Sequence, residues 1–377
     1  MLNKALSYFG YQKLKVTKQF KKGMPIGRQL RRYTYRVNLA MDKWRNALTA
    51  AEDPIRPNRE LLYATYHAAM DDDQLVAQIR TAHMNIQMGD FELRVNGKHE
   101  EKITELFDKP WFLKYISYLV DTEFWGHSLI QPMPGKDGWI EDVHLIYREH
   151  VNPHTGHIIL RPSDEKGISY KEGPLKGIVI PAGDSEDLGL LKQISKLIIR
   201  KEYNVIDWGR RNERFGIPFI VVKTADTDKA QLDEKERYLE NLGASGWAIV
   251  GTDDDFEIKE AVGGAGGGHL TFKDAIAYFD KCVAFTVNGQ TANAERVTHV
   301  GNAESQERQL NKYTLARMRR IQYHLNYILL PWLARYHNYP TINASFHYLD
   351  LEVNEEEEKI QVDNTVTEKK KEQDTLK

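Results

Sequence analysis

Hydrophobic side chains recur every three or four positions in four long stretches of the chain. This spacing places them on one face of an amphipathic helix, so we expect four helices that each bury one side. The expected ranges are 58–87, 188–215, 270–287 and 304–337.

Polar residues and prolines mark where these helices begin and end. Asn58 is a plausible N-cap of the first helix, and Asp184 or Asp187 of the second. Asn288-Gly289 stops the third helix, and Pro331 predicts a kink in the fourth. A shorter helix is expected after Pro110.

Between the helices, hydrophobic and polar residues alternate at every second position, which is typical of strands. Strands are predicted at 91–95, 128–131, 139–147, 157–160, 177–180 and 346–353. A second group surrounds a predicted helix over 229–242, with strands at 219–222, 248–250 and 256–258. The pattern indicates an α+β fold with a small α/β insert between two long helices.

Charge is distributed unevenly along a nearly neutral chain. The 377 residues contain 52 Lys+Arg and 54 Asp+Glu, for a net charge of −2. That balance excludes a wholly basic nucleic-acid coat and a wholly acidic disordered chain. Residues 1–45 carry twelve bases and one acid, whereas 223–262 carry eleven acids and five bases and 350–377 carry ten acids and five bases. Such segregation favours different partners for different regions, although solvated faces and tails give the same pattern.

Cys282 is the only cysteine, which excludes an intrachain disulfide and any multi-cysteine metal site. No run of about 18 apolar residues occurs, so no membrane-spanning helix is expected. Residues 1–9 lack the apolar core and cleavage site of a signal peptide.

Phosphate-binding and metal motifs are weak. No P-loop motif is present, and the glycines of 263–268 do not fit a dinucleotide fingerprint because His269 takes the last position. A flexible hinge is the favoured interpretation of that stretch.

Two groups of side chains could ligate a metal. His150, His154 and His157 flank Pro153 and Gly156, which favours a surface turn. Asp71–Asp73 and Asp253–Asp255 could bind Mg²⁺, yet consecutive carboxylates rarely converge on one ion, so acidic turns are favoured. We therefore expect no catalytic, metal or cofactor site.

Two helices are rich in bases that could contact phosphates. In the helix over 188–215 these lie off the apolar stripe, and the helix over 304–337 has six Lys/Arg and two Glu. A solvated helix face explains either one equally well. The bases of the first helix are Lys192, Lys196, Arg200, Lys201, Arg210 and Arg211.

The order of these elements, together with three short motifs, resembles the portal proteins of tailed phages, and the Mu-like portals in particular. Trp125–Gln131 is similar to the family's Trp-Gly turn into a strand. Between Leu191 and Phe219, Lys201, Asp207-Trp208 and Glu213–Pro218 match its lysine, Asp-Trp and Glu-x-Phe-Gly-x-Pro pattern. Asn288–Thr291 resembles its Leu-Gly-Gln-Thr segment.

The resemblance implies a ring, usually of twelve subunits, at one capsid vertex of the virion, assembled in the host cytoplasm. Double-stranded DNA would pass through it, driven by the terminase large subunit, and a head–tail connector and the major capsid protein would bind it. It further implies a basic N-terminal segment (1–50), a wing (51–182 and 304–353), stem helices (183–215 and 269–287), a clip (216–268), a tunnel loop (288–303) and a tail or rudimentary crown (354–377).

Site residues follow from these roles. The tunnel loop would present Asn288, Gln290, Thr291, Asn293, Arg296 and His299 to DNA. Asp253, Asp254, Asp255 and Glu257 would form the docking surface of the clip, and Trp208, Phe215 and Phe279 would pack the stem. A metal-dependent nuclease is the alternative from another class, and a monomeric structural adaptor is a third.

Overall fold

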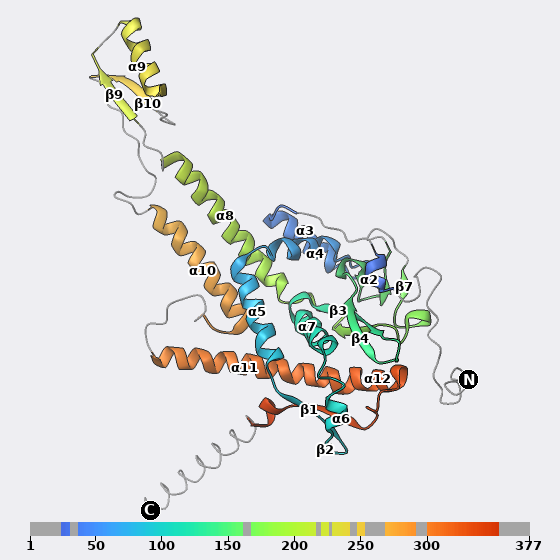
Figure 1. Cartoon of the computed structure of the whole chain (residues 1–377). Coiled ribbons are helices and arrows are strands. Elements are labelled where there is room, and N and C mark those ends of the chain that lie inside the picture. The colour runs from blue at the N-terminus through green and yellow to red at the C-terminus, as the bar shows by residue number, and fades with distance from the viewer. Residues whose placement is uncertain are drawn as a thin grey trace, which may run out of the picture. The chain divides into compact units, whose positions relative to one another are not determined.

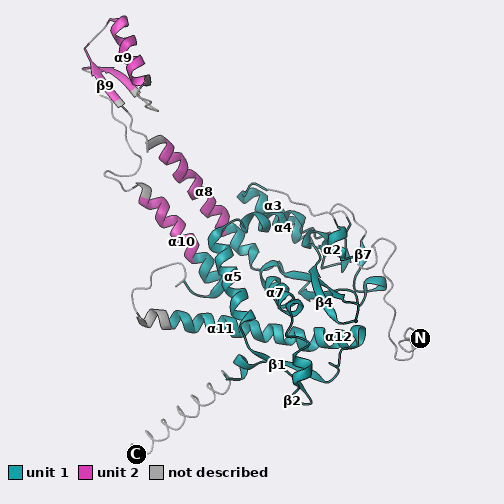
Figure 2. Cartoon of the chain, viewed as in Figure 1, with its two compact units in different colours: residues 1–196, 282–377 teal, residues 197–281 magenta. Residues whose placement is uncertain are grey.

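The computed structural model describes residues 24–30, 37–160, 167–215, 220–225, 228–241, 247–252, 268–291 and 300–353. The chain divides into two compact units, residues 1–196 with 282–377 and residues 197–281 (Figure 2). The smaller unit is thus inserted in the sequence of the larger one. Among the described residues, no helix is long and apolar enough to cross a membrane.

Helices form most of unit 1 (Figure 1). The first of the expected long helices is two helices, because Asp72 ends the turn after α4 and caps α5 by accepting a hydrogen bond from Leu75 N at 2.9 Å. The helices with residues in this unit are α2 (Ile26–Gln29), α3 (Met41–Ala51), α4 (Glu60–Ala69), α5 (Asp73–Gln87), α6 (Glu101–Thr104), α7 (Pro110–Trp125), α8 (Leu191–Phe215), α10 (Gly268–Asn288), α11 (Val300–His324) and α12 (Leu330–His337), with short 3₁₀ turns at Arg148–His150 and Gly173–Leu175.

The helix caps and the kink that the sequence predicts differ in position from those in the structure. Asp184 and Asp187 do not cap α8; their carboxylates accept from Glu186 N and Gly189 N in the turns before it. A π-helix over Leu325–Leu329 separates α11 from α12, and Pro331 follows in the first turn of α12. The irregularity expected at Pro331 therefore begins one turn earlier.

Three small sheets complete unit 1. One has the order β11-β1-β2, and β1 pairs antiparallel with β11, Phe91 opposite Tyr348. The predicted strand over 346–353 ends at Tyr348, and residues 349–353 are helical. The other sheets have the orders β4-β3-β8 and β5-β6-β7. Bounds are β1 (Phe91–Val95), β2 (Lys98–His99), β3 (His127–Pro134), β4 (Ile140–Leu145), β5 (Val151–Asn152), β6 (His157–Ile158), β7 (Ile168–Ser169), β8 (Ile180–Gly183) and β11 (Ala344–Tyr348).

The turn from α7 into β3 depends on glycine. Gly126 has φ +82°, and a Cβ there would lie 2.3 Å from the Asp187 carbonyl oxygen. Gly183 and Gly189, also at positive φ, approach the same turn closely enough that a Cβ would meet backbone atoms of residues 124–126. The Trp-Gly motif thus lets three backbone segments pack in direct contact.

A core of aromatic side chains lies beside α7. Phe107, Phe112 and Phe346 are almost fully buried, and their rings pack within 6 Å of each other in two pairs: Phe107–Phe112 at 5.2 Å and Phe112–Phe346 at 5.7 Å between centroids. The N-terminal segment also contributes to unit 1, because Ile26 is buried and its N–H donates to Gln131 Oε1 at 2.7 Å.

Unit 2 contains most of α8 and α10 and a small β-α-β motif. Lys201 of α8 and Asp280 of α10 form an ion pair of 2.5 Å, so the two helices lie side by side here. β9 (Ile220–Thr224) and β10 (Trp247–Gly251) are parallel neighbours joined through α9 (Lys229–Asn241). The predicted strand over 256–258 and most of the glycine-rich stretch lie outside the described residues.

Candidate functional site

The end of α10 is fixed inside unit 1 by side chains from α5 and α11. Asn288 is fully buried, and its amide donates to the main-chain carbonyl of Gln78 at 3.0 Å and to its side-chain oxygen at 2.8 Å. Gln78 belongs to α5 and is itself buried. The sequence predicts Asn288 in an exposed loop, and its burial shows that this prediction is wrong.

The next residues continue this anchored segment. Gly289 has φ +69°, and a Cβ there would collide with the Tyr313 ring of α11. Gln290 is buried, and Thr291 N donates to Gln306 Oε1 at 3.2 Å. The exposure expected for Gln290 is therefore also wrong. The other predicted loop residues, Asn293, Arg296 and His299, lie outside the described residues.

Arg317 is the centre of the junction. Its side chain is only 3% exposed, and it donates to both carboxylate oxygens of Glu123 at 3.0 and 3.2 Å. It also donates to Asn288 Oδ1 at 3.1 Å and to the Val287 carbonyl. A cation here satisfies the Val287 carbonyl at the end of α10 and lies at the negative end of the helix dipole.

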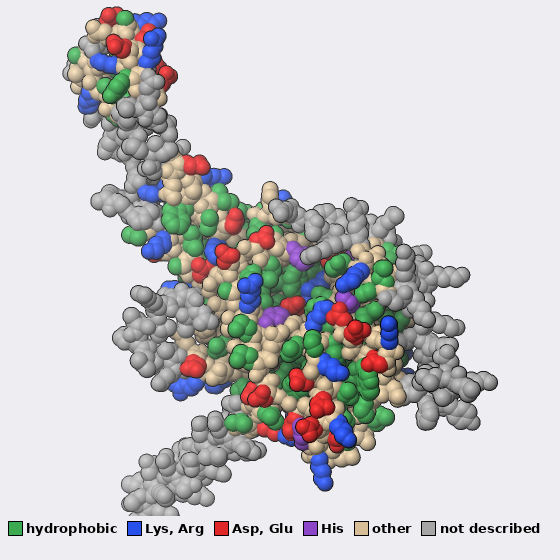
Figure 3. Space-filling model, in the orientation of Figure 1, with side chains coloured by type: hydrophobic (Ala, Val, Ile, Leu, Met, Phe, Trp, Pro, Cys, Tyr) green, Lys and Arg blue, Asp and Glu red, His purple; other side chains and the backbone are tan. Residues whose placement is uncertain are grey.

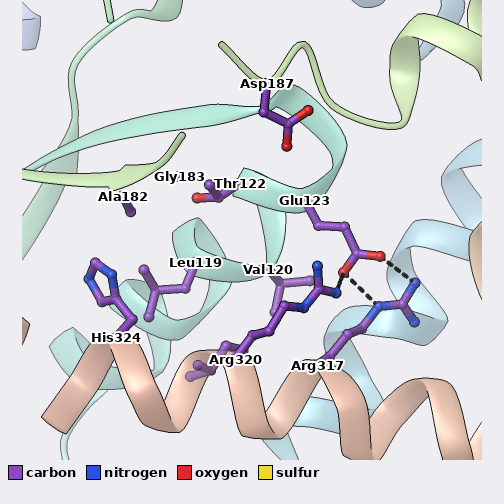
Figure 4. Close-up of a pocket in the computed structure, with 11 residues that line it drawn as sticks. Leu119, Val120, Thr122, Glu123, Ala182, Gly183, Asp187, Arg317, Arg320 and His324 are labelled. Carbon is purple, nitrogen blue, oxygen red and sulfur yellow. Dashed lines mark hydrogen bonds and ion pairs between the residues drawn. The ribbon is translucent and has the colours of Figure 1, made fainter. Parts of the chain in front are cut away.

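Glu123 binds a second arginine on the solvent side. Arg320 is 62% exposed and donates to Glu123 Oε2 at 2.6 Å, so two cations converge on one carboxylate (Figure 4). The group carries one net positive charge. It borders a pocket of about 240 Å³ that is lined by Leu119, Val120, Thr122, Glu123, Ala182, Gly183, Asp187, Arg317, Arg320, Ile321 and His324.

His324 is the titratable group at the far end of this pocket. Burial lowers its pKa to about 4, which keeps the imidazole neutral near pH 7. The Tyr115 hydroxyl lies 2.8 Å from its Nε2. Burial also raises the pKa of Tyr115, so neither group is set up to exchange a proton near neutrality.

The bases of α8 are largely paired. Lys192 contacts Glu52 at 2.6 Å, Lys201 contacts Asp280, and Arg210 contacts Asp207 at 3.1 Å. Lys196 is half-buried, Arg200 is exposed, and Arg211 is half-buried. These pairs reduce the positive charge that α8 offers to a phosphate.

The predicted packing residues have a mixed outcome. Trp208 and Phe279 are half-buried in the single chain, and the side chain of Phe215 is outside the described part. The predicted docking residues Asp253, Asp254, Asp255 and Glu257 also lie outside it.

No group of three metal-ligating side chains occurs in the part of the chain that the structure describes. His150 is buried with Nδ1 2.7 Å from the Ile159 carbonyl oxygen, so the surface turn expected for it is wrong for that residue. His157 Nδ1 instead contacts the Thr155 carbonyl oxygen at 2.8 Å. Among Asp71–Asp73, Asp72 serves as the cap of α5.

A comparison with models of protein families gives one match that covers most of the chain. The family is described as the portal protein of Mu bacteriophage, and the match extends over residues 63–375. The chain belongs to this portal family.

One solved structure agrees at the level of fold. A chain from the neck of an empty GTA particle, computed with C6 symmetry, is 7% identical with a TM-score of 0.50, and the match covers 86% of this chain and 90% of that one. An HK97-family phage portal protein from Corynebacterium diphtheriae is 11% identical with a TM-score of 0.44, covering 77% and 96%. A comparison with curated proteins finds no match.

The expected α+β portal-type fold and portal function are thus confirmed. A portal protein is a structural component of the virion: an oligomeric ring at the capsid vertex, in contact with the capsid and other phage proteins. The nuclease alternative receives no support.

Sequence reasoning missed the Arg317–Glu123 pair of this portal protein. Arg317 occurs in the apolar register of its helix, four residues before the buried Ile321. A base at such a position is the signal that could have indicated a buried ion pair, because an unpaired charge is too costly to bury.

Proposed function

We propose that this portal protein closes into a ring of twelve subunits around a channel through which double-stranded DNA is packaged and ejected. The observation that carries the proposal is the apolar surface left open on both long helices. On α8, Val205 and Ile206 are exposed, and on α10 Tyr278 is 62% exposed. Stable rings cover such surfaces with a neighbouring copy. The structure of the GTA neck was computed with six-fold symmetry. A ring of twelve subunits is compatible with that symmetry, because twelve is a multiple of six.

Regions of the chain then take the following roles. Residues 51–182 with 304–353 form the wing, 183–215 and 269–287 the stem, 216–268 the clip, and 354–377 a tail or rudimentary crown. The wing contacts the major capsid protein, and assembly takes place in the host cytoplasm before DNA is packaged. Residues 1–50 supply a basic segment, in which Ile26 is buried.

The clip receives the terminase large subunit and the head–tail connector. The charge of the segment supports this role, because residues 223–262 carry eleven acids and five bases. Asp233, Glu234, Glu236 and Glu240 of α9 are exposed, as are the bases Lys229 and Arg237. An acidic surface attracts partners with basic surfaces and repels DNA, which keeps the exit of the channel clear.

The loop over 288–303 borders the channel. Its first residues have a structural role, since Asn288 and Gln290 are buried, and contact with passing phosphates falls to Asn293, Arg296 and His299. Weak contacts suit this task, because every contact is repeated around the ring and tight ones would stop translocation.

The mass of the particle in solution tests the ring. We expect a closed ring of twelve copies of the 43.6 kDa chain, visible as such in negative stain. Tyr278→Glu places a charge on the open apolar surface and should shift the particle to smaller species, while Lys273→Gln makes the same change in charge on another side of α10 and should not. A wild-type protein that stays monomeric would contradict the proposal.

A further inference from the structure

Asparagine is followed directly by glycine at two places in the sequence, Asn96-Gly97 and Asn288-Gly289. At such a dipeptide the backbone nitrogen of the glycine can attack the side-chain amide carbon of the asparagine, because glycine has no Cβ to hinder the approach. The two sites therefore share one reactive chemistry, and the structure gives them opposite surroundings.

The first dipeptide is the two-residue turn that joins β1 to β2. Asn96 and Gly97 have φ of +51° and +79°, and Val95 pairs with Lys98 across them. Positive φ at both central residues is the mark of a type I′ turn, one of the preferred connections of a two-residue hairpin. Both residues are exposed, and a Cβ on Gly97 would meet nothing within 4 Å. The turn thus has room to change conformation and is in contact with water.

The second dipeptide belongs to the junction at the end of α10. Asn288 is fully buried, its amide nitrogen donates to both carbonyl groups of Gln78, and its amide oxygen accepts from Arg317 at 3.1 Å. The attacking atom is held as well, because Gly289 N donates to the Phe285 carbonyl at 2.9 Å. Neither the amide carbon nor the backbone nitrogen can move toward the other while these contacts last.

We propose that Asn96 is a site of spontaneous deamidation, and that the junction around Arg317 protects Asn288 from the same reaction. The Gly97 nitrogen loses its proton to hydroxide and forms a bond to Asn96 Cγ, and the Cγ–Nδ2 bond breaks to release ammonia. Water then opens the cyclic imide at one of its two carbonyls, which gives aspartate or isoaspartate. Overall, one water is taken up and one ammonia is released, and no enzyme or cofactor takes part.

The turn can reach the reactive geometry without separating the strands. Ring closure requires the Gly97 nitrogen to eclipse Asn96 Cβ about the Cα–C bond, at a ψ of roughly −120°, which is the value of the first central residue of a type II′ turn. That residue also has positive φ, as Asn96 already does. A flip of the peptide between the two residues is therefore enough, and glycine accepts the new φ. Both turn types suit two-residue hairpins, so Val95 and Lys98 can stay paired.

Deamidation changes both the charge and the backbone of this hairpin. Each product replaces a neutral amide by a carboxylate. Acidic side chains already gather at the lower edge of unit 1 in Figure 3, over β1, β2 and α6, so the new charge adds to an acidic surface. Isoaspartate also lengthens the main chain by one carbon atom, which disturbs the pairing of Val95 with Lys98. The reaction thus records the age of each copy as a local change of charge.

Peptide mapping by mass spectrometry tests the inference on the full-length wild-type protein, held folded in mildly alkaline buffer and sampled over time. Asn96 should deamidate at least about tenfold faster than Asn288, because a buried segment reacts only in the rare molecules in which it opens. Asn343 is a second control within the chain, since it is exposed and is followed by Ala344. It should also react more slowly than Asn96, because the alanine methyl group hinders the attacking nitrogen.

The same protein unfolded in urea separates the effect of sequence from that of structure. Both Asn-Gly dipeptides should then react at similar rates, since the contacts of Asn288 are lost and the two sites share one chemistry. Asn343 should remain slow in urea, because its neighbour Ala344 is unchanged.

Isoelectric focusing gives an independent readout of the charge. Aged wild-type protein should develop a more acidic form that migrates with fresh Asn96→Asp protein. Asn96→Gln is the matched control: it keeps a neutral amide, but its longer side chain must close a six-membered ring, which forms more slowly. Aged Asn96→Gln protein should therefore form much less of the acidic species.

Three results would overturn the inference. These are equal rates at Asn96 and Asn288 in the folded protein, a rate at Asn96 no greater than that at Asn343, and an acidic form that develops equally in Asn96→Gln. None of these measurements requires a ring or DNA, so their outcome is independent of the proposed function.

Discussion

Arg317 donates to both oxygens of the Glu123 carboxylate across 194 positions of sequence, and the same guanidinium donates to the carbonyl of Val287 at the end of α10. One buried side chain therefore connects α7, α10 and α11. The junction determines where α10 ends and the loop over 288–303 begins.

Arg317→Met should destabilise the protein by about 3–5 kcal/mol, because it leaves Glu123 without its buried partner and the Val287 carbonyl without this donor. Urea unfolding monitored by circular dichroism measures the loss. Arg320→Gln removes the exposed member of the same group and should cost less than about 1 kcal/mol. Equal losses of stability in the two variants would show that the contribution of Arg317 does not depend on its burial.

Stability should fall as the pH drops below about 6.5. Burial lowers the pKa of His324 to about 4, of His337 to about 4 and of His127 to about 3. An unfolded histidine titrates near 6.5, so between 6.5 and these values the unfolded chain binds protons that the folded chain does not, which favours unfolding. Above about pH 7 the three groups have no effect.

His324→Gln isolates one of these contributions. The amide can still pair with the Tyr115 hydroxyl but does not titrate. Urea midpoints at about pH 7.5 and about pH 5 should therefore differ less in the variant than in the wild type. The same difference in both proteins would mean that His324 is not neutral in the folded state.

Gly126→Ala should prevent the close packing of the Trp-Gly turn. The new Cβ would lie 2.3 Å from the Asp187 carbonyl oxygen, in backbone that cannot easily move, so we expect a loss above about 3 kcal/mol. Gly97→Ala is the matched control: its φ is +79° and nothing lies within 4 Å, so only the backbone penalty of about 1–2 kcal/mol remains. Thermal unfolding of the two variants distinguishes crowding from backbone conformation.

Reversing the charge of Asp253, Asp254 and Asp255 to Lys should leave the ring intact and weaken binding of the terminase large subunit. The loss should be greater at low salt, because charge attraction across an interface is screened by ions. Pull-down of the motor protein at two salt concentrations checks this. Normal binding of the terminase by the triple variant would show that the clip is not the docking surface.

Replacing residues 292–299 by a Gly/Ser linker of equal length should spare ring assembly, since Asn288 and Gln290 keep their buried contacts. We expect less DNA to be retained in filled heads, because Arg296 and its polar neighbours are gone. Genome content and packaging rate of the heads are the measurements. Heads that fill and hold DNA normally would refute a role of this loop in the channel.

The long elements could be predicted from sequence because their side chains repeat over many turns. The helices α8 and α10 begin and end within three residues of their predicted ranges, and the parallel β9-α9-β10 motif is also present. The break between α4 and α5 was missed, since the apolar spacing continues across Met70–Asp72 while the carboxylate of Asp72 starts a new helix.

The candidate site was harder to predict, because its partners are distant in sequence. Asn288 looks like an ordinary loop residue until Gln78, 210 positions earlier, is seen to accept both of its amide hydrogen bonds. Local composition predicts exposure for such a residue, and only tertiary packing reverses it. The bases of α11, by contrast, were visible in the sequence, and the structure shows that Arg317 is buried while Arg320 is exposed.

The pairing of β1 with β11 also has a consequence for the order in which the protein can fold during synthesis. Phe91 cannot pair with Tyr348 until that residue, about 250 positions later, has been synthesised. At about 5–20 residues per second, a ribosome needs roughly 10 to 50 seconds to reach it. By then every residue of unit 2 has been made. The inserted unit is therefore free to fold while β1 still lacks its partner, and Phe346 closes the aromatic core last.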